Sequence, residues 1–83
     1  MTDRRLLIFT TLARTLSFSE TARLLGITQP AVSKCIATME AEIGSALFVR
    51  YGRNVSLTDK GRKLKTLAEK ILEGYSEIDL IKE

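Results

Sequence analysis

The chain has 83 residues, of which 45% are hydrophobic and 28% charged, and its formal net charge is +3. This length fits one small domain of marginal stability, and so small a positive charge is weak evidence for a nucleic-acid partner. The sequence has no histidine, which excludes imidazole metal sites and His-dependent triads, and no phosphate-cradling glycine loop, so we expect no enzyme, cofactor or metal.

The first predicted element is a helix from about Asp3 to Leu16, with Thr2 or Asp3 as its cap. The side chains that it supplies to the core are Leu6, Phe9, Leu12 and Ala13. Leu7 and Ile8 overfill this apolar stripe. They either pack beneath the last helix of the same or a neighbouring subunit, or form a harmless exposed pair.

Residues 17–43 have the spacing of a helix-turn-helix. A short helix from Glu20 to about Leu25 carries the small residue Ala22 where it crosses the next helix. Gly26 ends this helix, because glycine enters left-handed backbone geometry without a Cβ penalty. The second helix begins after Thr28, whose side-chain oxygen can accept from a backbone N–H in its first turn, and stops at Gly44.

The second helix has a buried stripe and a small, polar opposite face. The stripe comprises Val32, Ile36, Met39 and Ile43. The opposite face comprises Gln29, Pro30, Ser33, Lys34, Ala37 and Thr38. Such a face can enter a B-DNA major groove, where glutamine can bridge the edge of adenine while Ser33 and Lys34 reach phosphates or base edges. In an ordinary helical hairpin, the same residues would serve packing alone.

Two short β-prone runs, residues 47–49 and 55–57, flank a glycine-containing turn signal at residues 51–54. This pattern predicts a hairpin, or wing, that carries Arg50 and Arg53. A guanidinium at a hairpin tip suits the DNA backbone or a minor groove, whose negative potential attracts it. The alternative is that both arginines are solvated side chains on a surface loop.

Charge is distributed unevenly along the second half of the chain. Residues 50–65 include six basic side chains and one acidic side chain, whereas residues 66–83 include two basic and five acidic ones. We therefore expect the wing and the start of the last helix to face nucleic acid, and the far end of that helix to point away from it.

Thr58 is the predicted cap of the last helix, which carries apolar residues in a heptad a/d pattern. The pattern comprises Leu64, Leu67, Ile71, Ile78 and Ile81, with Gly74 at the remaining d position. A helix this apolar on one side needs a partner, so we predict an antiparallel or crossed homodimer. Its interface residues are Leu64, Leu67, Ile71, Tyr75 and Ile78. The alternative is that the helix folds back on its own domain.

The single cysteine, Cys35, flanks the buried stripe and is expected to be a semi-buried apolar residue rather than a redox sensor. One cysteine permits no internal disulfide, which suits a reducing compartment. The sequence shows no secretory signal and no apolar stretch of membrane-spanning length. We therefore expect a cytoplasmic protein without membrane contact.

Several motifs at these separations resemble the amino-terminal DNA-binding domain of LysR-type transcriptional regulators over about residues 4–72. They are Ser17-Phe18, the run from Thr28 to Ser33, Leu47-Phe48 with Arg50, and Gly52-Arg53. The resemblance implies a mainly α fold, with a winged helix-turn-helix of three core helices and a two-stranded β wing at residues 1–58. A linker helix at residues 59–83 would then pair two subunits.

The same resemblance implies double-stranded DNA as the partner and dimers that form higher oligomers in the full-length protein. A small-molecule effector would act only through a further domain that is absent from this chain. The implied DNA contacts are Thr28, Gln29, Pro30, Ser33, Lys34, Thr38, Arg50 and Arg53. Members of the family commonly have arginine or glutamine along the recognition helix, whereas this chain departs from that pattern at Lys34 and its neighbours. This departure weakens guanine recognition in particular.

Two classes of function fit these residues. The first is a sequence-specific transcription regulator that binds DNA as a dimer. The second is a winged-helix module that uses the small face of the second helix to contact another protein. The basic wing favours the regulator, because a protein-docking module has no need to concentrate positive charge there.

Overall fold

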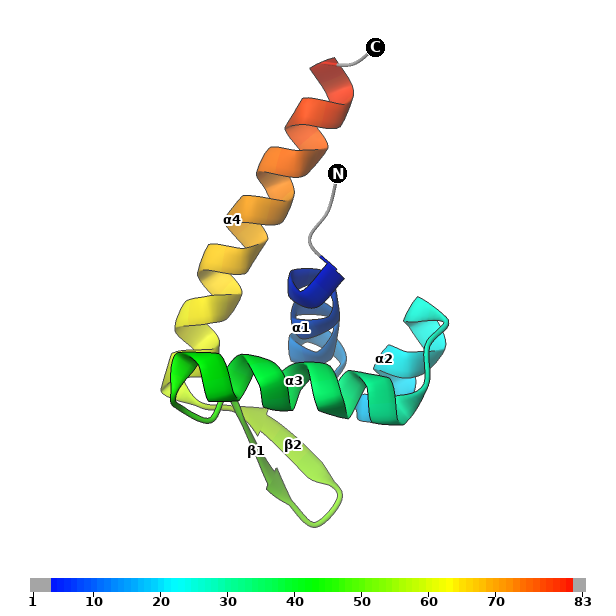
Figure 1. The fold of residues 1–83 in the computed structure, drawn as a ribbon, viewed down its shortest axis with the longest axis vertical. Coiled ribbons are helices and arrows are strands. Elements are labelled where there is room, and N and C mark those ends of the chain that lie inside the picture. Colours follow the sequence, from blue (N-terminus) through cyan, green and yellow to red (C-terminus); the bar gives the residue numbers. More distant parts are fainter. Residues whose placement is uncertain (1–3, 82–83) are drawn as a thin grey trace.

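The computed structural model describes residues 4–81, which form four helices and one two-stranded sheet. The order is α1 (Arg4–Thr15), α2 (Phe18–Leu25), α3 (Gln29–Ile43), β1 (Phe48–Tyr51), β2 (Asn54–Leu57) and α4 (Asp59–Ile81). In Figure 1, the β1–β2 hairpin projects to one side of the α1–α3 body and α4 projects to the other. The predicted winged helix-turn-helix with a long last helix is confirmed.

Helix α1 supplies the centre of the core through Phe9 and Leu12, which are fully buried. The cap predicted for this helix, Thr2 or Asp3, lies outside the described residues. The pair Leu7 and Ile8 divides: Ile8 is buried in the domain's own core, whereas Leu7 remains 38% exposed. Ile8 is therefore not part of an exposed pair. Leu6, predicted to be in the core, is only partly buried at its edge.

Helix α2 begins at Phe18, two residues before the predicted start. The reason is Ser17, whose side-chain oxygen accepts a hydrogen bond from the Glu20 N–H at 3.1 Å and thereby caps the helix. Gly26 ends α2 with φ at 65°, as the glycine signal predicted. This early start brings the Phe18 ring into the core, where it is 7% exposed.

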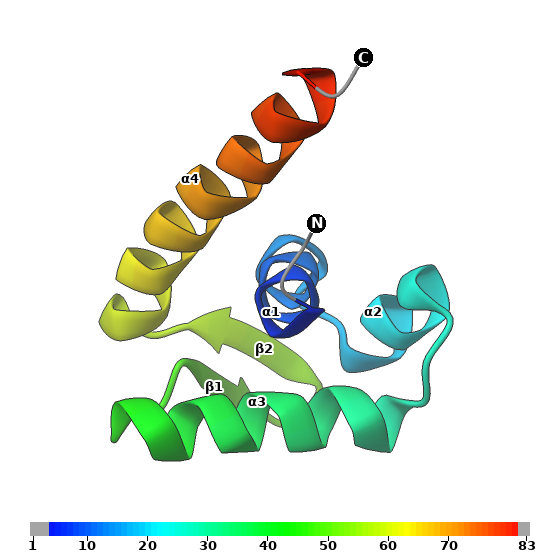
Figure 2. The same ribbon diagram turned by 45° about the horizontal axis from the view of Figure 1, so that its top comes forward.

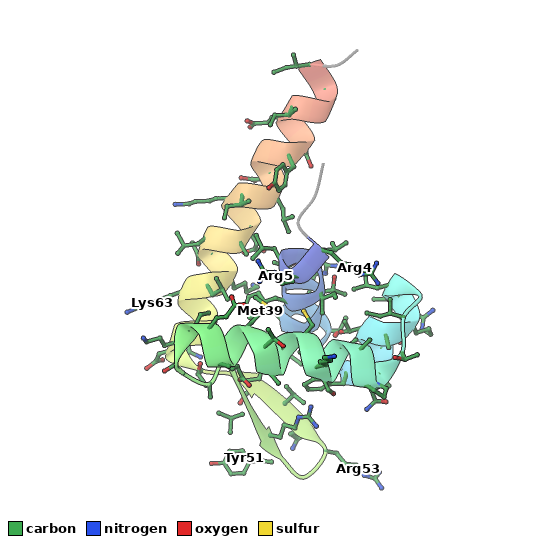
Figure 3. All side chains as sticks on the ribbon, viewed as in Figure 1. Arg4, Arg5, Met39, Tyr51, Arg53 and Lys63 are labelled. Carbon is green, nitrogen blue, oxygen red and sulfur yellow. The ribbon has the colours of Figure 1, made fainter. Side chains whose placement is uncertain are left out.

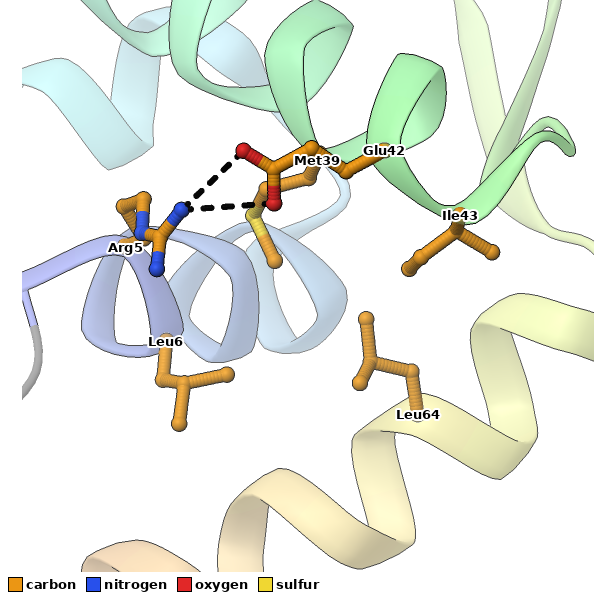
Figure 4. Close-up of a pocket in the computed structure, with 6 residues that line it drawn as sticks. All are labelled: Arg5, Leu6, Met39, Glu42, Ile43 and Leu64. Carbon is orange, nitrogen blue, oxygen red and sulfur yellow. Dashed lines mark hydrogen bonds and ion pairs between the residues drawn. The ribbon is translucent and has the colours of Figure 1, made fainter.

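Helix α3 has the predicted ends, because Thr28 Oγ1 accepts from the Ala31 N–H at 3.2 Å and Gly44 adopts φ of 79°. Val32, Ile36 and Met39 are buried as predicted, but Ile43 is 40% exposed. Its placement in the buried stripe was wrong because the last turn of α3 reaches past the packed core. Figure 4 shows Ile43 beside Leu6 and Leu64 at a pocket of about 100 Å³ instead.

The hairpin pairs Phe48 with Leu57 at its base and Tyr51 with Asn54 at its tip, so Gly52 and Arg53 form a two-residue turn. Leu47, just before β1, is fully buried, and the Phe48 ring lies 5.4 Å from the Phe9 ring between centroids. The base of the wing is therefore part of the core, and its tip is exposed.

Helix α4 starts where the Thr58 side chain makes two hydrogen bonds. Its Oγ1 accepts from the Gly61 N–H at 3.0 Å, which confirms the predicted cap, and donates to the Ala46 carbonyl at 2.7 Å. Only the first turns of α4 pack on the body, through the fully buried Ala68 and the half-buried Leu64. Figure 2 shows the rest of the helix extending away from the other elements, so α4 does not fold back on its own domain.

Candidate nucleic-acid interface

The outward face of α3 carries most of the predicted contact residues. The side chains of Gln29, Pro30, Lys34 and Thr38 are exposed, as is the cap Thr28, while Ser33 is half-buried. No acidic residue lies in the first turn of α3, so no carboxylate there neutralises the partial positive charge of its unpaired N–H groups. The start of this helix is thus exposed, small in side-chain volume and favourable for an anion.

The wing places Arg50 on β1 and Arg53 in the turn. Figure 3 shows Arg53 at the tip of the hairpin, far from the labelled residues of α1. Both arginines and Gln29 border one hollow of about 260 Å³, which residues 16–19, around the start of α2, also line. The structure therefore brings the first residue of the recognition helix and the two wing arginines to one concave surface.

A second hollow, of about 150 Å³, lies along the middle of α3. Ser33 and Ala37 border it on the helix, and Phe48 and Arg50 border it on the wing. Phe18 and Arg50 line both hollows, and the Arg50 guanidinium carbon lies 3.7 Å from the centroid of the Phe18 ring. The Phe18–Arg50 pair therefore borders both hollows.

Lys34 and Thr38 do not join the wing. They border a third hollow, of about 340 Å³, on the opposite flank of α3, together with Arg4 and Arg5 of α1. Cys35 also borders it and is half-buried, as expected. The predicted contact face therefore has a wing side, with Gln29 and Ser33, and an α1 side, with Lys34 and Thr38.

Two residues that shape this surface were missed from the sequence. Phe18 has no role in the sequence analysis, although its ring contacts the Arg50 guanidinium. Glu40 likewise has no role in the sequence analysis, yet it is half-buried, and its Oε2 accepts from the N–H groups of Leu47 at 2.7 Å and Phe48 at 3.3 Å. The available signal for Phe18 was its position as an aromatic residue directly after the serine that caps α2.

Charged side chains near this face are partly paired. On α2, a hydrogen bond from Arg23 lowers the pKa of the Glu20 carboxyl, and the same contact raises the pKa of Arg23. At the start of α4, Arg62 pairs with Asp59, the only acidic residue between positions 50 and 65. The neighbouring Lys60 and Lys63 are exposed. Within residues 4–81, no group of three Asp, Glu or Cys side chains is gathered in a way that could hold a metal ion.

The predicted dimer residues lie along α4 and differ in accessibility. Leu67, Ile71 and Ile78 are 57%, 47% and 42% exposed. Tyr75 is half-buried, and Leu64 is half-buried because it packs against the core of its own domain. The described part of α4 therefore presents a row of accessible apolar side chains away from the body.

A three-helix body, a capped recognition helix and a two-stranded wing define the fold class of winged helix-turn-helix DNA-binding domains. The family described as "Bacterial regulatory helix-turn-helix protein, lysR family" matches residues 4–62. The chain belongs to this family of bacterial transcription regulators. Among the described residues, we find no helix with the length and apolar character needed to cross a membrane.

Curated relatives share this family. An uncharacterized HTH-type transcriptional regulator from Azotobacter vinelandii is 50% identical over 64 residues, which are 77% of this chain and 44% of that protein. The HTH-type transcriptional regulator CbbR from Rhodospirillum rubrum is 45% identical over 76 residues, which are 92% of this chain and 26% of CbbR. The chain thus spans less than half the length of these relatives.

Solved structures share the fold. A transcriptional regulator of the LysR family from Eggerthella lenta is 39% identical with a TM-score of 0.77, covering 83% of this chain and 99% of that chain. The BenM_DBD/catB site 1 DNA complex is 30% identical with a TM-score of 0.91, covering 99% of this chain and 91% of that one. The CbnR_DBD–DNA complex is 27% identical with a TM-score of 0.89, covering 99% and 94%.

Proposed function

We propose that this chain is the DNA-binding segment of a LysR-type transcription regulator, with α3 in the major groove and the wing on the backbone or in the minor groove. The observation that carries the proposal is the single concave surface shared by Gln29, Arg50 and Arg53. Two structural relatives, at 30% and 27% identity, are complexes with DNA, which supports the same partner here.

Each contact residue has a proposed role that follows from its position. Gln29, exposed in the first turn of α3, can bridge the donor and acceptor edge of adenine. Ser33 and Lys34 reach phosphates or base edges, whereas Arg50 and Arg53 attract the backbone through their guanidinium groups. The remaining proposed contacts, at the ends and flank of this face, are Thr28, Pro30 and Thr38.

The charge pattern also suits this orientation. The basic residues of the wing and of the start of α4 lie near the proposed contact face, while the acidic half of α4 extends away from the body. Phosphate therefore attracts one end of the molecule and repels the other, which orients the domain as it approaches DNA. The proposed action is binding without catalysis, in the cytoplasm, where bacterial DNA lies.

We also propose that α4 pairs antiparallel with α4 of a second copy. The a and d positions are spaced symmetrically along the helix. One antiparallel register therefore places each a position opposite a d position of the second copy. In that register, Leu64 lies opposite Ile81, Leu67 opposite Ile78 and Ile71 opposite Gly74 of the second copy. Glycine opposite isoleucine lets the two helices approach closely.

The proposed register has an electrostatic test. It places Lys70 beside Glu77 of the second copy, twice by symmetry, on one flank of the apolar seam. Lys70→Glu and Glu77→Lys should each lower the dimer fraction measured by light scattering at micromolar concentration, because like charges then face each other. The double exchange should restore it. Monomer mass for the unmodified chain would contradict the dimer.

In this proposal, residues 1–58 form the DNA-binding domain and residues 59–83 the dimerisation helix of a longer regulator. A small-molecule effector would act through a separate domain of that regulator. The full-length regulator would form an oligomer larger than a dimer. The curated relatives, of which the matched residues make up 44% and 26%, support a longer protein.

Fluorescence anisotropy tests the DNA-binding function. The chain is titrated with a pool of genomic fragments, and then with a recovered fragment and its scrambled copy across a salt series. We expect tight, salt-sensitive binding, with a preference of roughly a hundredfold or more for a fragment with two half-sites. No binding at low salt would contradict the proposal and favour a protein-docking module.

A further inference from the structure

We propose that Phe18 is a positioning residue of the DNA interface. Its ring holds the Arg50 guanidinium in the orientation in which Arg50 binds a backbone phosphate. The inference rests on the proposed DNA-binding function and adds to it a residue without any DNA contact of its own.

The ring of Phe18 is a rigid support. It lies at the start of α2, where the Ser17 cap sets the beginning of the helix, and it is 7% exposed. Arg50 comes from β1, and its guanidinium carbon lies 3.7 Å from the ring centroid, well within the range of a cation–π contact. A buried aromatic ring in a fixed position therefore packs against an exposed cation.

This contact leaves the arginine competent for DNA. A guanidinium is planar and directs its five N–H donors outward in that plane, so stacking occupies a face and leaves the edges available to phosphate oxygens. A carboxylate partner would instead occupy those edges and cancel the charge. An aromatic ring thus restrains the long side chain while preserving both its donors and its charge.

The contact also links the wing to the helix-turn-helix. Glu40 fixes the base of the hairpin through the N–H groups of Leu47 and Phe48, and Phe18 holds Arg50 two residues further along β1. Arg50 borders the hollow shared with Gln29 and the hollow shared with Ser33. Holding Arg50 therefore sets its position relative to both residues of the recognition helix.

Nuclear magnetic resonance of the chain without DNA tests the stack. The ring current of Phe18 should move the Arg50 Hδ resonances upfield, and Phe18→Leu should abolish that shift while Phe18→Tyr retains it. Phe9→Leu is the control, because Phe9 is likewise a buried phenylalanine but borders neither of the hollows that Arg50 lines. An Arg50 shift that Phe18→Leu leaves unchanged would overturn the proposal.

Anisotropy with the recovered fragment tests the consequence, at a temperature where every variant is folded by circular dichroism. We expect Phe18→Leu to raise Kd by roughly threefold to tenfold, on the scale of one cation–π contact, with Phe18→Tyr and Phe9→Leu near the unmodified chain. In an Arg50→Ala background, Phe18→Leu should change nothing further. An equal loss in both backgrounds would overturn the positioning role.

The two proposals fail differently. If the unmodified chain binds no DNA, DNA binding and the positioning role are both wrong. If the unmodified chain binds and Phe18→Leu binds equally well after losing the stack, only the positioning role is wrong. Arg50→Lys, which keeps the charge without the planar group, should resemble Phe18→Leu in Kd.

Discussion

The carboxylate of Glu40, near the end of α3, accepts a 2.7 Å hydrogen bond from the backbone N–H of Leu47, just before the wing. A second, longer bond joins the same oxygen to the next N–H along the chain. The recognition helix thus directly sets the position at which the hairpin leaves the core.

Glu40→Ala should therefore destabilise the domain. Hydrogen bonds to a charged acceptor contribute about 1.5–3 kcal/mol, and the substitution leaves the two N–H groups in need of new partners. Urea unfolding followed by circular dichroism would measure the loss. Glu42→Ala is the control, because its exposed ion pair with Arg5, at 3.3 Å, should contribute less than about 1 kcal/mol. Equal losses in the two variants would contradict the wing-anchoring role.

Two glycines of α4 should respond in opposite directions to alanine. A Cβ at Gly61 would collide with the Leu47 carbonyl oxygen, whereas a Cβ at Gly74 meets no atom within 4 Å. Gly61→Ala should lower the melting temperature, since backbone would have to move. Gly74→Ala should stabilise the monomer by about 0.5–1 kcal/mol through helix propensity. Thermal unfolding at a protein concentration below that of dimer formation gives both values, and a stable Gly61→Ala would refute the close approach.

Gln29→Ala should affect base discrimination. Losing a bidentate contact to adenine should weaken cognate binding by about 1–3 kcal/mol and relax the preference at that base pair alone. The measurement is anisotropy with the cognate fragment, single base-pair variants and random DNA. Equal losses on cognate and random DNA would remove Gln29 from a base-contacting role.

Arg53→Ala should act on affinity rather than specificity. Since Arg53 lies at the wing tip, its removal should weaken binding to many sequences and reduce the slope of log K against log salt by about 1. Arg14→Ala is a suitable control, because Arg14 is an exposed arginine that borders none of the three hollows around α3. An unchanged salt slope for Arg53→Ala would mean that the wing tip does not contact the DNA backbone.

The contact between Glu20 and Arg23 predicts a pH effect. Because the hydrogen bond from Arg23 lowers the pKa of Glu20 in the folded state, its stabilising effect is present above the unfolded pKa and lost as pH falls through the folded one. The difference in melting temperature between the unmodified chain and Glu20→Gln should therefore shrink as the buffer is acidified through that range. A difference that grows instead would reverse the assigned direction.

Local signals were sufficient for most of the fold. Gly26 and Gly44 end their helices, and Thr28 and Thr58 begin theirs, because capping depends on residues within one turn. The turn signal around Gly52 likewise located the wing. The spacing of apolar residues gave the buried face of α3 except at Ile43, where the neighbouring elements no longer cover the helix.

The candidate site, too, could be predicted from the sequence only in part. The sequence by itself determined which residues form the outward face of α3 and which arginines lie on the wing, since both depend on helical period and turn chemistry. Only the tertiary structure decided that Gln29 meets Arg50 and Arg53 on one surface while Lys34 and Thr38 face α1. It alone also decided that Phe18 carries Arg50 and that Glu40 anchors the wing. These contacts join residues seven to thirty-two positions apart, and side-chain partners at such separations are set by how elements pack together, which no local pattern encodes.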